Sequence, residues 1–402
     1  MDTMAPPRKN FAGVGYAEAL RRAQALIPFL KQHAEASERA TQITPEILNA
    51  FHESGLLRYM QPRRWGGMEL DFVAVVDITE MLGRGDASAS WTFSNLSAHH
   101  RLLALWDAKA QEEIWGENPD ACIASGIAYV QGRGRKVGGG FVLSGKWGFS
   151  SGVDVATWNM LACVVYDDDK PVDWRMCLVP KGDYEIIDDW QTLGMRGTGS
   201  RSVQCKDVFI PEHRALCMHS ARPGFEYPGW KINTGAQYRV PLSGFGGHGI
   251  GGCMIGNAQA ALDETIAMVR SRSTSYSGAK MRDFQSVQLR IGMAAAKIDA
   301  ARVWLRNDCI EAQAIIESGG NIDTESRLRY KRNGAVGVKL ATEAVDSLHE
   351  MAGAHGIYDS NVLQRMFRDA HAAAGHINFS VDAQLPPWGL AALGGEFKSP
   401  TL

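Results

Sequence analysis

The sequence has 402 residues, of which 45% are hydrophobic and 21% are charged, and its net charge is −2. This balance gives no reason to expect nucleic acid or an anionic membrane as a partner. No apolar run reaches the roughly 20 residues that a bilayer-spanning helix needs, and the first ten residues are polar, so we expect a cytoplasmic protein. Seven cysteines without C-x-x-C spacing are expected to be reduced thiols, with no metal site.

The first third of the chain predicts four helices, because Ala, Leu, Glu and Arg recur there with helical periodicity. Thr44 followed by Pro45 is typical of a helix start, and Asp86 is expected to cap the last of the four helices. The expected ranges are 16–38, 45–55, 72–82 and 87–106.

From Ala121 to Cys217 short runs of Val, Ile, Trp and Cys alternate with turn signals, which favours strands. A segment rich in Pro, Gly and aromatic residues, 221–238, is expected to be a loop. Four long helices are then expected at 243–271, 281–317, 325–352 and 361–382. We therefore predict an N-terminal helical domain (1–120), a middle β-domain (121–220) and a C-terminal helical bundle (221–402).

Four local motifs follow one another along this layout. They are L-S-G-K-W-G-F-S-S-G at 143–152, G-M-R-G-T-G-S at 194–200 with V-F-I-P-E at 208–212, Arg272 with F-Q-S-V-Q-L at 284–289, and A-G-A-H-G-I-Y at 352–358 with R-M-F-R-D at 365–369. In this order they resemble the acyl-CoA dehydrogenase superfamily over nearly the whole chain. The resemblance implies a mainly α-helical fold with a central β-barrel or sandwich and a C-terminal four-helix bundle.

The sequence departs from that family where the dehydrogenases carry their catalytic glutamate. The segment 370–378 has no carboxylate, and neither has 243–261, where some members place the base instead. Because a histidine, His376, stands in the segment 370–378 instead, the chain resembles the flavin-dependent monooxygenase branch. This branch comprises the oxygenase components of two-component aromatic hydroxylases. That branch implies hydroxylation of a small aromatic or heteroaromatic compound through a flavin C4a-hydroperoxide, formed from O2 and reduced flavin (FADH2 or FMNH2).

The resemblance also implies a separate NAD(P)H:flavin reductase as partner. In agreement, the glycines at 132–134 and 138–140 are not followed by the helix that a nicotinamide-binding motif requires. A flavin dehydrogenase or oxidase of the same superfamily is the alternative enzyme, and a scaffold that has lost its cofactor is the non-enzymatic one. The missing carboxylate argues against the ordinary dehydrogenase.

Three residues are candidates for catalysis. His376 occupies the place of the dehydrogenase glutamate, and a histidine can donate or accept a proton near neutral pH. Ser150 is expected to face the flavin, with Ser151 as its competitor, because neighbouring strand residues point to opposite faces. His99 is expected near the substrate. Its neighbour His100 diverges from it by about 100° on a helix, so only one of the two can enter a given pocket.

The cofactor-binding candidates follow from the same resemblance. Ser150 or Ser151 and Trp147 would contact the flavin, with Trp91 as a further aromatic candidate. Arg272 would bind phosphate through its planar guanidinium, in the cofactor of a neighbouring subunit, and Phe284 and Gln288 would lie near it. Since the bundle helices carry apolar residues on more than one face, we expect a homotetramer. The 227–230 and 250–255 segments are expected to line the substrate pocket.

Overall fold

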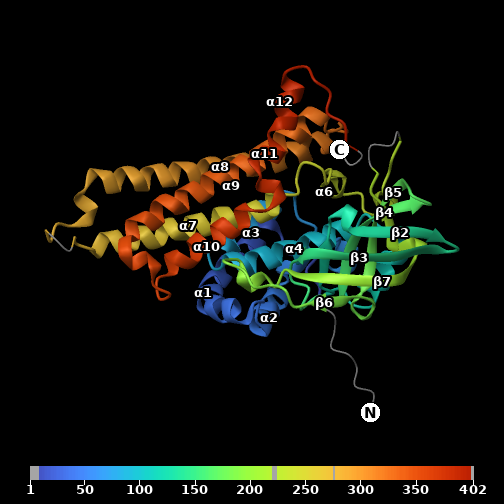
Figure 1. Ribbon diagram of the computed structural model, residues 1–402, viewed down its shortest axis with the longest axis horizontal. Helices are drawn as coiled ribbons and strands as arrows, with labels where there is room; N and C mark the ends of the chain where they lie inside the picture. The colour runs from blue at the N-terminus through green and yellow to red at the C-terminus, as the bar shows by residue number, and fades with distance from the viewer. Residues whose placement is uncertain (1–8, 220–223, 275–276, 400–402) are drawn as a thin grey trace, which may run out of the picture.

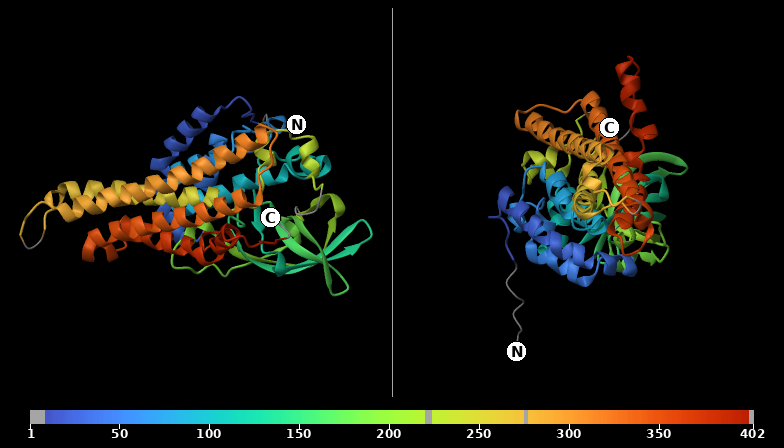
Figure 2. Two further views of the ribbon diagram at one scale, coloured as in Figure 1. Left: turned by 90° about the horizontal axis from the view of Figure 1, so that it is seen from above. Right: turned by 90° about the vertical axis from the view of Figure 1, so that its left-hand side faces the viewer.

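The computed structural model describes residues 9–219, 224–274 and 277–399. Figure 1 shows the long C-terminal helices on the left, the sheet on the right, and the N-terminal helices packed against both. The left view in Figure 2 shows the bundle projecting well beyond the sheet. The predicted fold, mainly helical with a central β-domain and a C-terminal bundle, is confirmed.

The N-terminal helices begin and end where the local sequence signals predict. Helix α2 starts at Pro45 and stops before Gly55, whose φ of +72° allows the left-handed turn that ends a helix. Asp86 caps α4, because its carboxylate accepts a hydrogen bond of 2.8 Å from the backbone N–H of Ala89. The helices are α1 (Tyr16–Ala40), α2 (Pro45–Ser54), α3 (Ala74–Gly83), α4 (Ala87–Leu103) and α5 (Ala108–Gln111).

The middle of the chain forms one eight-stranded sheet, and its strand Trp158–Asp167 is buried over seven consecutive residues. Its order is β6-β7-β3-β2-β4-β5-β8, and β1 pairs in parallel with β4. The strands are β1 (Ile123–Gly126), β2 (Gly132–Val137), β3 (Gly140–Ser150), β4 (Trp158–Asp167), β5 (Lys170–Pro180), β6 (Glu185–Ile187), β7 (Arg201–Pro211) and β8 (Ala215–Cys217).

Strand β3 contains a bulge that decides which of its last side chains face the core. Trp147 pairs with Val203, but Ser150 pairs with Arg201, so three steps on β3 oppose two on β7. The extra step falls at Phe149, whose φ is +62°. As a result Trp147 and Ser150 both point inward, although strict alternation would place them on opposite faces.

The C-terminal bundle packs closely on the N-terminal helices through glycines. A Cβ atom at Gly252 would lie 2.2 Å from the hydroxyl of Thr79, and one at Gly256 would lie 2.1 Å from the carbonyl oxygen of Glu80. Glycine is therefore required at both positions for α3 and α7 to approach this closely. The helices are α6 (Ala236–Arg239), α7 (His248–Ser271), α8 (Gln285–Glu317), α9 (Thr324–Ala352), α10 (Val362–Ala374), α11 (Val381–Gln384) and α12 (Pro386–Ala392).

Three predicted helix boundaries are wrong. The helix expected over 361–382 ends at Ala374, since His376 has extended backbone (ψ 139°) and begins a separate 3-10 turn. The helix expected from 243 begins only at His248, because the preceding Gly244 has φ +108°. The one expected from 281 begins at Gln285, after a short 3-10 turn.

The expected loop 221–238 is only partly irregular. Residues 220–223, which include the expected domain boundary, lie outside the described residues. The rest contains a 3-10 turn at Pro228–Lys231 and the start of α6. Within the described ranges, no helix has both the length and the apolar character that crossing a membrane requires. The same residues contain no group of three or more His, Cys, Asp or Glu side chains arranged to hold a metal ion.

Candidate active site

Trp91 on α4 joins three segments that are far apart in the sequence. Its indole N–H donates a hydrogen bond of 3.2 Å to the hydroxyl of Ser151, at the end of the bulged strand. The rings of His376 and Phe379, which follow α10, pack edge-on against it at 5.6 and 6.2 Å. The sheet, α4 and the segment after the bundle therefore meet at one side chain.

The two serines of β3 have different surroundings. The Ser151 hydroxyl bonds to Trp91 and, at 2.7 Å, to the hydroxyl of Ser200, which bonds in turn to Thr198. Ser150 is fully buried inside the sheet and accepts a hydrogen bond of 3.0 Å from the Asn159 amide. The sequence analysis put Ser150 first, but these contacts favour Ser151 as the serine that belongs to the site.

His376 is held by its own backbone. Its Nδ1 accepts a hydrogen bond of 3.2 Å from the backbone N–H of Asn378, so in the neutral ring the proton is on Nε2. Burial lowers the pKa of His376 to about 4. At neutral pH the side chain is therefore a neutral hydrogen-bond donor beside Trp91.

His99 lines a cavity of about 560 Å³ bounded by α4, the sheet, the 225–247 segment and α9. Its Nδ1 lies 2.5 Å from the carbonyl oxygen of Ile123. Because a carbonyl only accepts, Nδ1 carries the proton and Nε2 is left as an acceptor. Burial lowers the pKa of His99 to about 4. Other residues on the cavity wall include Ser125, Tyr227, Trp230, Ile250 and Asn378.

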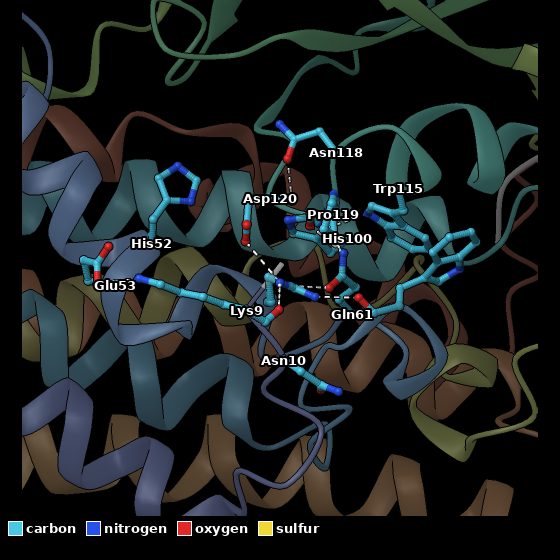
Figure 3. A network of polar contacts seen from close by, with 12 residues as sticks. Lys9, Asn10, His52, Glu53, Gln61, His100, Trp115, Asn118, Pro119 and Asp120 are labelled. Atoms are coloured by element: carbon cyan, nitrogen blue, oxygen red, sulfur yellow. Dashed lines mark hydrogen bonds and ion pairs between the residues drawn. The ribbon is translucent and has the colours of Figure 1, made fainter. Parts of the chain in front are cut away.

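His100 points away from the cavity into a polar network, which Figure 3 shows. Its Nδ1 accepts a hydrogen bond of 3.0 Å from the Trp115 indole. Gln61 lies beside it and donates to the carbonyl of Pro119 at 2.8 Å, while the buried Arg58 connects Gln61 to Asp120. His100 therefore has a structural role, and burial lowers its pKa to about 3.

Trp147 does not contact the site. Its ring is completely buried in the core of the sheet, and its indole N–H donates to the carbonyl of Ala162 at 2.8 Å. Gly126, Gly132 and Gly145 lie against the ring so closely that a Cβ atom on any of them would overlap it. With no ring face open to a cofactor, Trp147 is better assigned to the core than to flavin stacking.

The remaining cofactor candidates lie at the far end of the bundle. Arg272 ends α7 and donates a hydrogen bond of 3.1 Å to the carbonyl of Ala352. Phe284 and Gln288, at the start of α8, are exposed, and Gln288 bonds only to the carbonyl of Arg282 among the described residues. Figure 1 shows this end of α7 and α8 well away from the sheet, so these residues can meet a flavin near Ser151 only from another copy of the chain.

Two residues near the site were missed in the sequence. Phe149, pushed outward by the bulge, is 76% exposed and packs edge-on against Trp190. The Nε of Arg196 is buried and has no hydrogen-bond partner among the described residues. An exposed aromatic ring, a chain of hydroxyls from Ser151 and an unpaired guanidinium N–H fit a flavin, whose ring is aromatic and whose edge carries carbonyl acceptors. Both residues lie within motifs at 143–152 and 194–200, but the motifs do not show the outward position of Phe149, because the bulge arises from pairing with β7.

Asp369 is the last acid before His376 in the sequence, but it has a structural partner. One carboxylate oxygen accepts a hydrogen bond of 2.5 Å from the backbone N–H of Met195. Its burial, with Asp86 nearby, raises the pKa of Asp369 to about 7. Asp369 does not line the cavity. No carboxylate among the cavity-lining described residues can thus act as a dehydrogenase base.

Comparison with known proteins first shows the structural class of the chain, the acyl-CoA dehydrogenase fold. Residues 23–115 match the model of the acyl-CoA dehydrogenase N-terminal domain, and residues 248–381 match that of the acyl-CoA dehydrogenase C-terminal domain. The crystal structure of the 3-HSA hydroxylase from Rhodococcus sp. RHA1 superposes with a TM-score of 0.90 at 32% identity, covering 96% of this chain and 99% of that one.

Proteins related in sequence then show which family of this fold the chain belongs to. The oxygenase subunit HsaA, a flavin-dependent monooxygenase of Rhodococcus jostii (strain RHA1), is 34% identical over 89% of this chain and 93% of its own. The oxygenase component of the FADH2-dependent resorcinol hydroxylase of Rhizobium sp. (strain MTP-10005) is 32% identical over 94% of each chain. The chain belongs to this family, the oxygenase components of flavin-dependent monooxygenases with the acyl-CoA dehydrogenase fold.

The buried histidines make stability depend on pH. Burial lowers the pKa of His100 in the folded protein to about 3, whereas the unfolded chain takes up the proton near pH 6.5. The unfolded state thus binds more protons below pH 6.5, and the free energy of unfolding falls as the pH falls.

His100→Gln keeps an acceptor for Trp115 but cannot titrate. We expect its loss of stability between pH 7 and pH 5, measured by urea unfolding, to be smaller than wild type by about 2 kcal/mol. Equal losses in both proteins would contradict this.

Proposed function

We propose that this oxygenase hydroxylates a small phenolic or indolic compound, using O2 and reduced flavin (FADH2 or FMNH2) delivered by a separate NAD(P)H:flavin reductase. The observation that carries the proposal is the presence of two neutral histidines of opposite hydrogen-bonding character. His99 keeps an acceptor at Nε2 on the cavity wall, and His376 keeps a donor at Nε2 beside Trp91.

Each side chain has a task in that reaction. His99 would accept a hydrogen bond from the phenol O–H or indole N–H, which orients the ring and increases its electron density. His376 would donate a hydrogen bond to reduced oxygen, and the hydroxyls of Ser151, Ser200 and Thr198 would hold the flavin edge, with Arg196 and Phe149 beside them. The bound reduced flavin supplies the activation of O2. The apolar wall of the cavity would exclude water from that step.

The alternative of a flavin dehydrogenase or oxidase is not favoured. The relatives are monooxygenases, and no carboxylate lines the described part of the cavity. A cytoplasmic location is also our proposal. It is supported by the cysteines, none of which forms a disulfide in the described chain.

The experiment that tests the function supplies reduced FMN or FAD and 18O2 to the purified chain with a panel of phenols and indoles. We expect one atom of 18O in the hydroxylated product and no oxidation of NADH unless a reductase is added. Oxygen derived from water, or stoichiometric NADH consumption by the chain alone, would be incompatible with the proposal.

The roles of Ser150, Ser151 and His376 can be distinguished by measuring coupling in variants. Coupling is the amount of product formed per reduced flavin oxidised. Ser151→Ala should lower coupling and release H2O2, because the hydroxyl chain loses its end. Ser150→Ala should leave coupling unchanged but destabilise the fold by about 1–3 kcal/mol, since the Asn159 amide loses its acceptor.

His376→Ala should slow hydroxylation by about 10²–10⁴-fold with little change in flavin affinity. Stopped-flow single turnovers measure all three, and full coupling in both Ser151→Ala and His376→Ala would refute this assignment.

We further propose that the chain assembles through α8 into a homotetramer, in which Arg272 reaches a neighbour's flavin. A face of α8 exposes a row of apolar side chains, which is typical of an interface: Leu289, Met293, Val303, Trp304 and Ile310. Trp304→Glu should dissociate the assembly in light scattering and weaken flavin binding, whereas Trp304→Phe should do neither. A wild-type monomer with full flavin affinity would exclude the proposal.

A further inference from the structure

The charge on the cavity wall is of one sign. Four basic side chains line it: Arg101, Arg239, Arg327 and Lys331. Among the described residues that line it, none is acidic. Like charges around a partly enclosed space repel one another and attract anions. The cavity is therefore suited to a ligand that carries negative charge.

Two of the four cations already hold the wall together. Arg101 is buried and donates to the backbone carbonyls of Gln237 and Val240. Arg239 lies over the ring of Trp230, 5.3 Å from its centroid, and donates to its carbonyl oxygen. These contacts attach the 230–240 segment to α4 and leave the other two cations to be explained.

Arg327 and Lys331 lie four residues apart on α9, so they occupy the same face of the helix. Among the described residues Arg327 makes one hydrogen bond, from its Nε to the carbonyl of Ile322 at 3.1 Å. Lys331 makes no hydrogen bond or ion pair with any residue in the described ranges. Asp323, the acid whose charge acts on Arg327, is engaged in capping α9 through the Ser326 N–H. Burial lowers the pKa of both Arg327 and Lys331, as expected for half-buried cations with little compensating charge.

A third polar group, His248 at the start of α7, faces α9 about one turn beyond Lys331. His248 is completely buried, and its Nε2 is 3.1 Å from the carboxylate of Asp308. Its Nδ1 has no partner among the described residues. That atom faces Gly334, where an added Cβ would lie 3.8 Å from it, and both His248 and Gly334 line the cavity. A buried polar atom without a partner is costly, and a ligand would satisfy it.

The position of these groups relative to the oxidation site follows from α9. Val338 packs in the same cluster as Trp91 and Phe379. Lys331 is seven residues before Val338, and Arg327 is eleven residues before it. At 1.5 Å per residue, they lie about 10 and about 16 Å from Val338 along the helix axis. The free cations are thus at the end of the cavity remote from His376.

We propose that Arg327 and Lys331 form a carboxylate subsite, which binds the acidic side chain of an aromatic substrate whose ring lies near His99 and Asn378. This inference rests on the proposed aromatic hydroxylation and specifies its substrate class. The substrate is an arenecarboxylate whose acid is separated from the oxidised ring by a spacer. His248 Nδ1 provides the additional polar contact between the two ends.

The test compares matched acids and amides. The probes are 4-hydroxyphenylacetate, 3-(4-hydroxyphenyl)propanoate and 4-(4-hydroxyphenyl)butanoate, each with its primary amide. Binding is followed by tryptophan fluorescence without turnover, so it does not depend on hydroxylation. We expect at least one acid to bind about 10- to 100-fold more tightly than its amide, as charge-assisted hydrogen bonds allow. Equal affinity for every acid and amide, or no binding of any of them, would overturn the proposal.

Variants locate the effect. Lys331→Met loses no hydrogen bond or ion pair with described residues, so the fold should survive, and the preference for the acid should fall about tenfold or more. Lys331→Arg should retain it. Lys339→Met is the matched control on α9: this lysine is outside the cavity, 3.5 Å from Glu343, and its loss should leave the preference unchanged. Retention of the preference in an Arg327→Met/Lys331→Met double variant would overturn the proposal.

A flavin phosphate is the other anion that could bind these cations, and a second arm separates it from the substrate. In Lys331→Met the affinities for reduced FMN and reduced riboflavin should equal those of the wild type. If the affinity for reduced FMN falls to that for riboflavin, the cations bind flavin phosphate and the carboxylate subsite is wrong. If acids bind as expected but no probe is hydroxylated, the subsite stands and the proposed function fails.

Discussion

The site depends on the contact between the Trp91 indole and the Ser151 hydroxyl. This hydrogen bond joins α4 to the end of β3, and the faces of the same indole position His376 and Phe379. None of the three segments forms a pocket alone, because a helix, a strand end and a 3-10 turn each present only one side. An indole suits the junction since it combines a large apolar surface with one directional donor.

Burial gives the histidines roles that an exposed imidazole could not keep. His99 and His376 remain neutral at the pH at which a free histidine is partly protonated, and their backbone contacts fix opposite tautomers. One ring is thus a permanent acceptor and the other a permanent donor. An ionised carboxylate is acceptor-only, so under our proposal an imidazole at this place changes the available chemistry without changing the fold.

The sequence predicted what local signals determine and failed where distant pairing determines the outcome. Helix periodicity and the Asp86 cap predicted the helices, and the four motifs predicted the three-part fold. The preference for Ser150 over Ser151 came from the family resemblance, which could not show how the bulge at Phe149 turns the end of β3. The continuous helix expected to 382 breaks at Gly375, where the His376 side chain caps the next turn. Lys331 and Arg327 carry no motif, and their lack of partners is visible only in the folded chain.

The glycine contacts between α3 and α7 have a consequence for how such enzymes diversify. Because neither Gly252 nor Gly256 leaves space for a side chain, the separation of these helices is fixed and mutation cannot widen the pocket from that side. The start of α9 is not constrained in this way, whereas the 225–247 segment is, because a Cβ atom at Gly229 would lie 2.0 Å from the carbonyl oxygen of Ala104. Substrate range can therefore evolve, or be engineered, by changing the start of α9 while the rigid walls of the cavity are inherited unchanged.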